Sequence, residues 1–152
     1  MKGRALQWLS QREHSRAELR RKLLPHAATP DHDAPLAEVE QVLDWLAAHR
    51  YLSDERFAES RVNARSARYG NLRIRQELKQ HQVTLPPEVE QALRESEWDR
   101  AIAVRQRKFP NWPATPHDRA KQARFLAGRG FSPELIGRLL RTMGASGFDE
   151  GA

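Results

Sequence analysis

Apolar residues recur at helical spacing along almost the whole chain, and this pattern constrains the fold more than any other feature. Between Leu36 and Leu46, apolar residues return every three or four positions, as they do on the buried face of a helix. No segment shows the strict alternation of apolar and polar residues that is typical of a strand. The sequence therefore predicts an all-α protein with nine helical segments.

Short polar breaks separate these segments. Ser15, with Glu18 three residues later, has the pattern of a capping box, and Ser53 or Asp54 can cap a later helix. In the break Tyr69 to Asn71, Gly70 can close one helix and the Asn71 side chain can accept a hydrogen bond from the next. We expect one helix that starts at Leu85 to Glu88 and a further helix over Trp98 to Phe109. The tail at 144–152 is rich in glycine and is expected to be disordered.

Parts of the sequence repeat. Short apolar motifs that close a helix occur at Leu19 to Leu23, at Ile74 to Leu78, and at Phe125 with Leu126. We interpret them as three tandem three-helix repeats in an elongated, slightly curved array, where each unit covers its neighbour. The predicted boundaries are 1–50, 51–97 and 98–143, followed by the tail at 144–152.

Positive charge is concentrated near the middle of the chain. Between Arg61 and Lys79 there are six basic residues and one acid, Glu77, so this segment carries +5 of the formal net charge of +6. Arg61, Arg65 and Arg68 recur at helical spacing and are expected to share one helix face. The predicted basic face, for contact with a partner or DNA, comprises Arg61, Arg65, Arg68, Arg73, Arg75 and Lys79.

A second group of basic residues lies earlier in the chain. It comprises Arg16, Arg20, Arg21 and Lys22, and the nearby Glu13 and Glu18 offset part of its charge. Both groups could neutralise phosphates or pair with acidic side chains. The alternative for each is a solvated helix face. Tyr69 could stack on a base, although such residues are more often packed in the core.

The composition indicates the cellular compartment and the kind of partner to expect. The chain has no cysteine, so it holds no disulfide and no thiolate metal site, which fits a reducing cytosol. There is no long apolar run, and the polar, basic start lacks the apolar centre of a secretory signal. We expect a soluble, cytoplasmic protein that does not contact membranes and is attracted to acidic partners.

Catalysis is not expected. The histidines show no metal-ligand spacing and no adjacent nucleophile, and the glycines around Arg129 lack the features of a phosphate loop. Glu88 and Glu90 lie two apart on a helix and do not face each other, so they do not form a catalytic pair. The sequence predicts no catalytic residue, no metal and no cofactor.

Several motifs, in a fixed order, carry a resemblance to a known family. These are Ala5-Leu6; His14 to Leu19 with Lys22-Leu23; Tyr51 to Asp54 with Arg56 to Ala58; Gly70 to Ile74 with Glu77-Leu78; and Phe125 to Ala127 with Arg129 to Phe131. In this order and spacing the chain resembles the bacterial RecX regulatory proteins, from Ala5 to Leu140. One departure occurs at Gln82, where the family usually has glycine before the apolar residue, as this chain has at Gly130.

The resemblance implies three tandem three-helix repeats and a non-enzymatic modulator of the RecA recombinase. Such a protein would lie in the groove of the RecA–DNA filament and, in most cases, inhibit its ATPase, strand exchange and extension during DNA repair and the SOS response. A monomer is expected, with single- or double-stranded DNA as a further partner. The alternative is a nucleic-acid-binding protein without sequence preference, built from three-helix modules.

Overall fold

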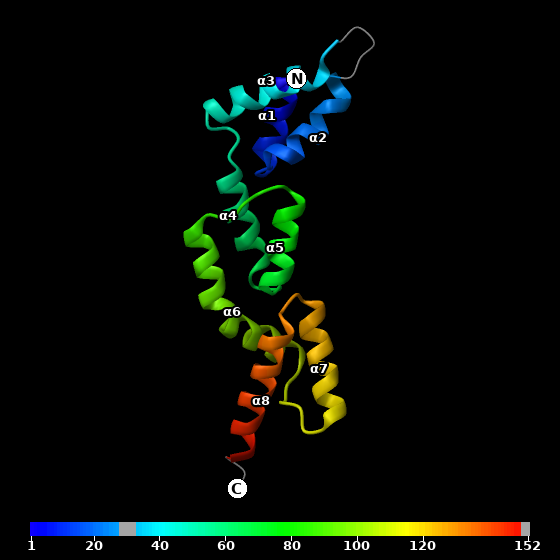
Figure 1. Ribbon diagram of the computed structural model, residues 1–152, viewed down its shortest axis with the longest axis vertical. Helices are drawn as coiled ribbons and strands as arrows, with labels where there is room; N and C mark the ends of the chain where they lie inside the picture. Colours follow the sequence, from blue (N-terminus) through cyan, green and yellow to red (C-terminus); the bar gives the residue numbers. More distant parts are fainter. Residues whose placement is uncertain (28–32, 150–152) are drawn as a thin grey trace. The chain divides into compact units, whose positions relative to one another are not determined.

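The computed structural model describes residues 1–27 and 33–149, and all regular structure in these ranges is helical (Figure 1). The prediction of an all-α fold is confirmed. The helices are α1 (Lys2–Gln11), α2 (Arg16–Ala27), α3 (Pro35–Ala48), α4 (Asp54–Arg65), α5 (Asn71–Gln80), α6 (Pro87–Lys108), α7 (Pro116–Gly128) and α8 (Pro133–Asp149). In these described ranges, no helix is long and apolar enough to span a bilayer.

Hydroxyl side chains start several of these helices. Ser15 Oγ accepts a hydrogen bond from the Glu18 N–H at 3.1 Å, and Ser53 Oγ accepts one from the Arg56 N–H at 3.2 Å. Both caps were predicted. Thr115 begins α7 in the same way, with its Oγ1 3.1 Å from the Asp118 nitrogen. Each cap satisfies an N–H that has no partner inside its helix.

Helices α5 and α7 end in the same motif. The Val83 N–H donates to the Leu78 carbonyl and the Phe131 N–H to the Leu126 carbonyl, five residues back in each case. The residue before each donor has positive φ, 56° at Gln82 and 93° at Gly130. This is the Schellman arrangement, which needs a left-handed residue after the helix. Gln82 therefore takes the conformation that glycine takes in the related turn, and the turn keeps its shape.

By packing, the chain divides into two units. The first contains 1–61 and 78–85, and the second contains 62–77 and 86–152. The boundaries of the three predicted repeats remain a prediction.

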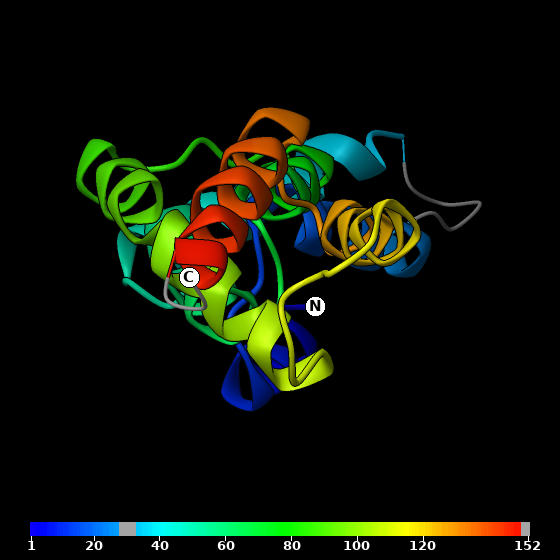
Figure 2. The same cartoon turned by 90° about the horizontal axis from the view of Figure 1, so that it is seen from below.

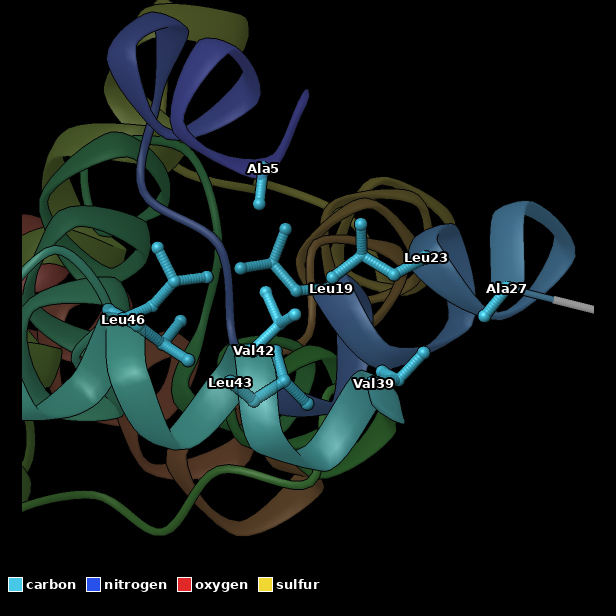
Figure 3. Close-up of a cluster of buried hydrophobic side chains, with 9 residues drawn as sticks. Ala5, Leu19, Leu23, Ala27, Val39, Val42, Leu43 and Leu46 are labelled. Atoms are coloured by element: carbon cyan, nitrogen blue, oxygen red, sulfur yellow. The ribbon is translucent and has the colours of Figure 1, made fainter. Parts of the chain in front are cut away.

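The core of the first unit gathers side chains from α1, α2 and α3, which point toward one another in Figure 3. Its buried members are Ala5, Leu19, Leu23, Ala27, Val39, Val42, Leu43, Leu46 and Leu52. They follow the apolar spacing of the sequence, so one face of each helix is covered by the other two.

The core of the second unit lies among α6, α7 and α8, which pack on one another (Figures 1 and 2). Its buried members are Ala101, Val104, Leu126, Phe131, Ile136, Leu139 and Leu140. The ring of Phe125, which packs against this core, meets that of Phe109 edge to face with the centroids 5.4 Å apart.

Three details differ from the sequence predictions. Helix α6 runs unbroken from Pro87 to Lys108 where two helices were expected, because no glycine or proline follows Pro87 within this stretch to interrupt the helix. Helix α8 continues to Asp149, so 144–149, expected to be disordered, is helical; 150–152 lie outside the described residues. Helix α4 ends at Arg65, and Arg68 lies in the turn that follows.

Candidate functional site: a divided basic surface

The six residues of the predicted basic face fall in both packing units. Arg61 and Lys79 belong to the first, and the other four belong to the second. The Arg61 guanidinium carbon lies 5.0 Å from the centroid of the Phe57 ring, so this side chain lies over an aromatic core residue. Lys79 is exposed near the end of α5.

Two arginines of the second unit are paired with acids. Arg65 Nε lies 3.3 Å from a carboxylate oxygen of Glu77, and Arg75 Nη2 lies 2.5 Å from Glu90 Oε1. All four side chains are partly exposed, so each pair adds little stability but offsets charge. The positive charge that this segment can offer to a partner is therefore smaller than the count of basic residues in the sequence indicates.

Arg68 and Arg73 remain exposed. Arg73 lies over the Tyr69 ring with its guanidinium carbon 4.0 Å from the centroid, and Nη1 donates to the Gly128 carbonyl at 3.4 Å. In the ranges that the structure describes, the Arg68 side chain makes no hydrogen bond or ion pair. Because Arg68 is not on α4, the structure does not stack it with Arg61 and Arg65 along one helix face.

Two of the four residues of the earlier basic group are paired with acids within the first unit. Arg16 Nη2 donates to Glu40 at 2.7 Å and to Asp44 at 2.6 Å, and Arg20 Nε also donates to Glu40. The hydrogen bonds from Arg20 and Arg16 lower the pKa of Glu40 to about 2. Arg16 and Arg20 therefore bind α2 to α3.

The other two members of that group differ. Lys22 is partly buried, with Nζ 4.3 Å from the Trp8 ring centroid and 2.9 Å from His14 Nε2. His14 is buried, and the loss of water around it lowers its pKa. Arg21 is exposed.

A hydrogen-bond network fixes the turn between α4 and α5. The Arg100 guanidinium donates to the carbonyls of Ser66 at 3.1 Å, Tyr69 at 2.9 Å and Leu93 at 3.1 Å, and also to the Asn71 side-chain oxygen. Burial lowers the pKa of Arg100, and these acceptors offset the lost hydration.

Asn71 has a different role from the predicted cap. Its side-chain nitrogen donates to the Leu93 carbonyl at 3.0 Å, and its backbone N–H donates to Glu97 Oε2 at 2.8 Å. The residue is buried and belongs to α5 itself. It connects the start of α5 to the middle of α6, where the helix changes direction in Figure 1.

Sequence reasoning missed a basic pocket in the second unit. It has a volume of about 320 Å³, and its lining comprises Arg68, Val104, Arg107, Lys108, Phe125 and Arg129. Four of these six side chains are cationic and none is acidic. The available signal was that α6 ends in basic residues and that Arg129 follows α7 directly.

The second unit also contains a buried arginine that the sequence did not predict. Arg105 is only 1% exposed, and Nη1 donates to the Asn111 carbonyl at 2.9 Å and to Gln122 Oε1 at 3.0 Å. Its guanidinium carbon lies 3.6 Å from the Trp112 ring centroid. Burial lowers its pKa. Arg105 holds the loop between α6 and α7 against the core, so its role is structural.

Exposed cations lie at or near the ends of several helices, and these side chains can bind anionic groups. Within the described ranges, no group of three or more histidine, aspartate or glutamate residues is placed to hold a metal ion.

Comparison with known proteins identifies the family. Two sequence models match the chain: the second three-helix domain of RecX over residues 53–93 and the third over residues 95–140. A protein named Regulatory protein RecX from Ralstonia nicotianae is 50% identical over 93% of this chain and 86% of its own length. A protein of the same name from Pseudomonas entomophila is 48% identical over 90% of this chain and 86% of its own length.

Solved structures agree on the fold. The crystal structure of RecX from Lactobacillus salivarius superposes with a TM-score of 0.70 at 18% identity, covering 95% of this chain and 94% of the other. A second crystal structure, of a regulatory protein RecX, gives a TM-score of 0.66 at 22% identity, covering 91% of this chain and 70% of the other. The chain belongs to the RecX family of regulatory proteins.

Proposed function

We propose that this protein regulates the RecA recombinase by binding the groove of the RecA–DNA filament. In this proposal it inhibits the filament's ATPase, strand exchange and extension during DNA repair and the SOS response. Membership of the RecX family supports a regulatory role, since relatives that are about half identical carry the name Regulatory protein RecX.

The observation that carries the proposal is the set of exposed cations in the segment from Arg61 to Lys79. Arg68, Arg73 and Lys79 are exposed, whereas Arg65 and Arg75 are paired with acids. Exposed arginine and lysine residues can pair with acidic side chains or phosphates and steer association with an anionic filament. We propose that these three residues make the principal contacts and that Arg16 and Arg20 of α2, which are paired with acids, do not.

In this proposal the protein acts by binding, as a monomer in the cytoplasm, and needs no cofactor. Its effect would follow from occupying a surface of the filament. Because the contact is electrostatic, the affinity should fall steeply as salt concentration rises.

Paired charge reversals test the proposal. Arg68→Glu with Lys79→Glu changes two exposed side chains that make no hydrogen bond or ion pair with the described residues. The control, Arg94→Glu with Lys121→Glu, makes the same change in net charge at two exposed positions outside the predicted basic face. We expect the first variant to need at least about tenfold more protein for half-inhibition of the filament's ATPase, because two electrostatic contacts are reversed.

Both variants should keep the wild-type circular dichroism spectrum. Equal inhibition by the two variants would show that the basic segment is only a solvated surface. Binding to DNA alone, to the recombinase alone and to the assembled filament separates this proposal from general nucleic-acid binding. A regulator of the filament should bind the filament most tightly, whereas a general nucleic-acid binder should bind DNA equally well without recombinase.

A further inference from the structure

The ends of three helices meet at the basic pocket of the second unit. Arg68 follows α4, Arg107 and Lys108 end α6, and Arg129 follows α7. A cation at a helix C-terminus is stabilised by the helix dipole, which explains each residue taken singly. It does not explain why four cations line one hollow of about 320 Å³ with no acid in its lining.

Two of the four cations are held in place. The Arg107 guanidinium donates to the Ala67 carbonyl at 2.5 Å and to the Ala103 carbonyl at 3.3 Å. The Arg129 guanidinium carbon lies 5.3 Å from the Phe125 ring centroid and 5.6 Å from that of Tyr69. Carbonyls and rings orient these arginines without cancelling their charge, so less rotational freedom is lost when an anion binds.

The other two cations are free to adapt. Arg68 and Lys108 are exposed, and neither side chain makes a hydrogen bond or ion pair within the described part of the chain. The four like charges repel one another, and this repulsion is relieved when an anion enters. A pocket with two fixed and two adaptable donors suits a compact anion with several acceptor oxygens.

We propose that this pocket binds a phosphate group of a nucleic-acid backbone. A phosphate offers tetrahedral oxygens to donors that approach from several helices, whereas a single carboxylate is satisfied in one plane by one arginine. The pocket also has an apolar wall, formed by Val104 and Phe125, against which a sugar or base can pack. Contacts to phosphate carry no sequence information, so binding at this pocket should show no sequence preference.

This inference deepens the proposed function, because it assigns the DNA of the filament a contact site on this chain. It is tested without recombinase. Lys108→Glu reverses one adaptable charge of the pocket, and Lys121→Glu makes the same change at an exposed position of α7 outside it. Neither residue belongs to the basic face of Arg61 to Lys79.

The first measurement is fluorescence anisotropy of a labelled oligothymidylate at several salt concentrations. We expect Lys108→Glu to weaken binding about three- to tenfold and to reduce the log–log salt slope by about 1, as loss of one phosphate contact does. Lys121→Glu should change the affinity less than about twofold, since Lys121 is exposed and does not line the pocket. The same loss should appear with oligoadenylate.

The second measurement is a titration of the wild-type protein with inorganic pyrophosphate, followed by NMR of the arginine side chains. The Nε–H signals of Arg107 and Arg129 should shift in a saturable way, and Lys108→Glu should weaken that response. Equal DNA binding by the two variants, or no pyrophosphate response at these arginines, would overturn the inference. So would stronger competition by a polyglutamate peptide than by pyrophosphate, since it would assign the pocket to an acidic protein segment.

The two proposals fail separately. If Lys108→Glu binds free DNA like the wild type while Arg68→Glu with Lys79→Glu loses inhibition of the filament, the pocket inference is wrong and the regulatory proposal stands. If Lys108→Glu loses DNA binding while the paired reversal inhibits normally, the pocket is supported as a site for free DNA, but the assigned filament contact is wrong and so is a role of the pocket in the filament, because Arg68 also lines the pocket. Circular dichroism and thermal unfolding confirm that each variant is folded.

Discussion

The backbone of Gly70 lies directly against that of Gly130, although sixty positions separate them in the sequence. The Gly70 N–H donates to the Arg129 carbonyl at 2.8 Å, and the Leu72 N–H donates to the Gly130 carbonyl at 3.1 Å. A Cβ atom on Gly70 would lie 2.5 Å from the Phe131 nitrogen and closer still to the Gly130 carbonyl oxygen. The turn before α5 and the turn after α7 thus meet where neither backbone carries a side chain.

Gly70→Ala should lower the free energy of unfolding by about 2–3 kcal/mol, because the added methyl meets backbone atoms that cannot move aside cheaply. Gly130→Ala should cost at least as much, since φ is 93° there and a Cβ would lie 2.9 Å from the Arg73 nitrogen. Gly128→Ala is the control. Its Cβ would meet nothing within 4 Å, and it lies in α7, so it should be neutral or stabilise by up to about 1 kcal/mol. Urea unfolding measures all three, and similar losses at 70 and 128 would contradict this account.

The turn after α5 gives a prediction of opposite sign. Gln82 has φ of 56°, a left-handed conformation that strains a residue with a Cβ and suits glycine. Gln82→Gly should raise the free energy of unfolding by about 0.5–1 kcal/mol, the relieved strain being reduced by the flexibility of glycine in the unfolded chain. Gln80→Gly, two residues earlier within α5, should lower it by about as much. Loss of stability in both variants would mean that Gln82 is not strained.

Sequence patterns predicted the features of this fold that arise within one helix or turn. The apolar spacing between Leu36 and Leu46 indicated a buried helix face, and Ser15 and Ser53 were recognised as caps, because these patterns involve residues a few positions apart. The contact of Gly70 with Gly130 depends on how distant helices pack, and no local pattern records it. In the sequence, Gly70 was recognised only as a residue that can close a helix.

The candidate site was predicted less well for the same reason. Counting charge between Arg61 and Lys79 did not show that Arg75 pairs with Glu90, fifteen positions later. Nor did it show that Arg68 lies after the end of α4 and lines the same pocket as Lys108. Ion pairs between helices cancel charge, and packing of helix ends concentrates it, so the sequence alone located the basic residues without their partners.

The correspondence between the ends of α5 and α7 predicts equal effects at Leu78 and Leu126. Both side chains are buried, and both carbonyls accept the bond that closes the following turn. Leu78→Ala and Leu126→Ala should each lower the free energy of unfolding by about 2–5 kcal/mol, through lost apolar burial and the cavity left behind. Leu72→Ala is a matched control, because Leu72 is 49% exposed and should change stability by less than about 0.5 kcal/mol. A core substitution as mild as Leu72→Ala would show that the wrong helix face was assigned.

The ion pairs of Glu40 predict how stability depends on pH. Arg20 and Arg16 donate to its carboxylate and lower its pKa to about 2, from 4.5 in the unfolded chain. Between these values the unfolded chain binds more protons than the folded one, so stability must rise with pH in this range. The contribution of Glu40 is therefore fully present above about pH 5 and is lost as pH falls toward 2.

Glu40→Gln removes this titration, so its stability deficit relative to wild type, measured by urea unfolding, should shrink between pH 5 and pH 3. The exposed Glu59→Gln, which changes no ion pair of the described residues, should show no such convergence. A deficit at Glu40 that stays constant down to pH 3 would show that Arg16 and Arg20 do not hold this carboxylate in its charged form, and would return both arginines to the set available for an external partner.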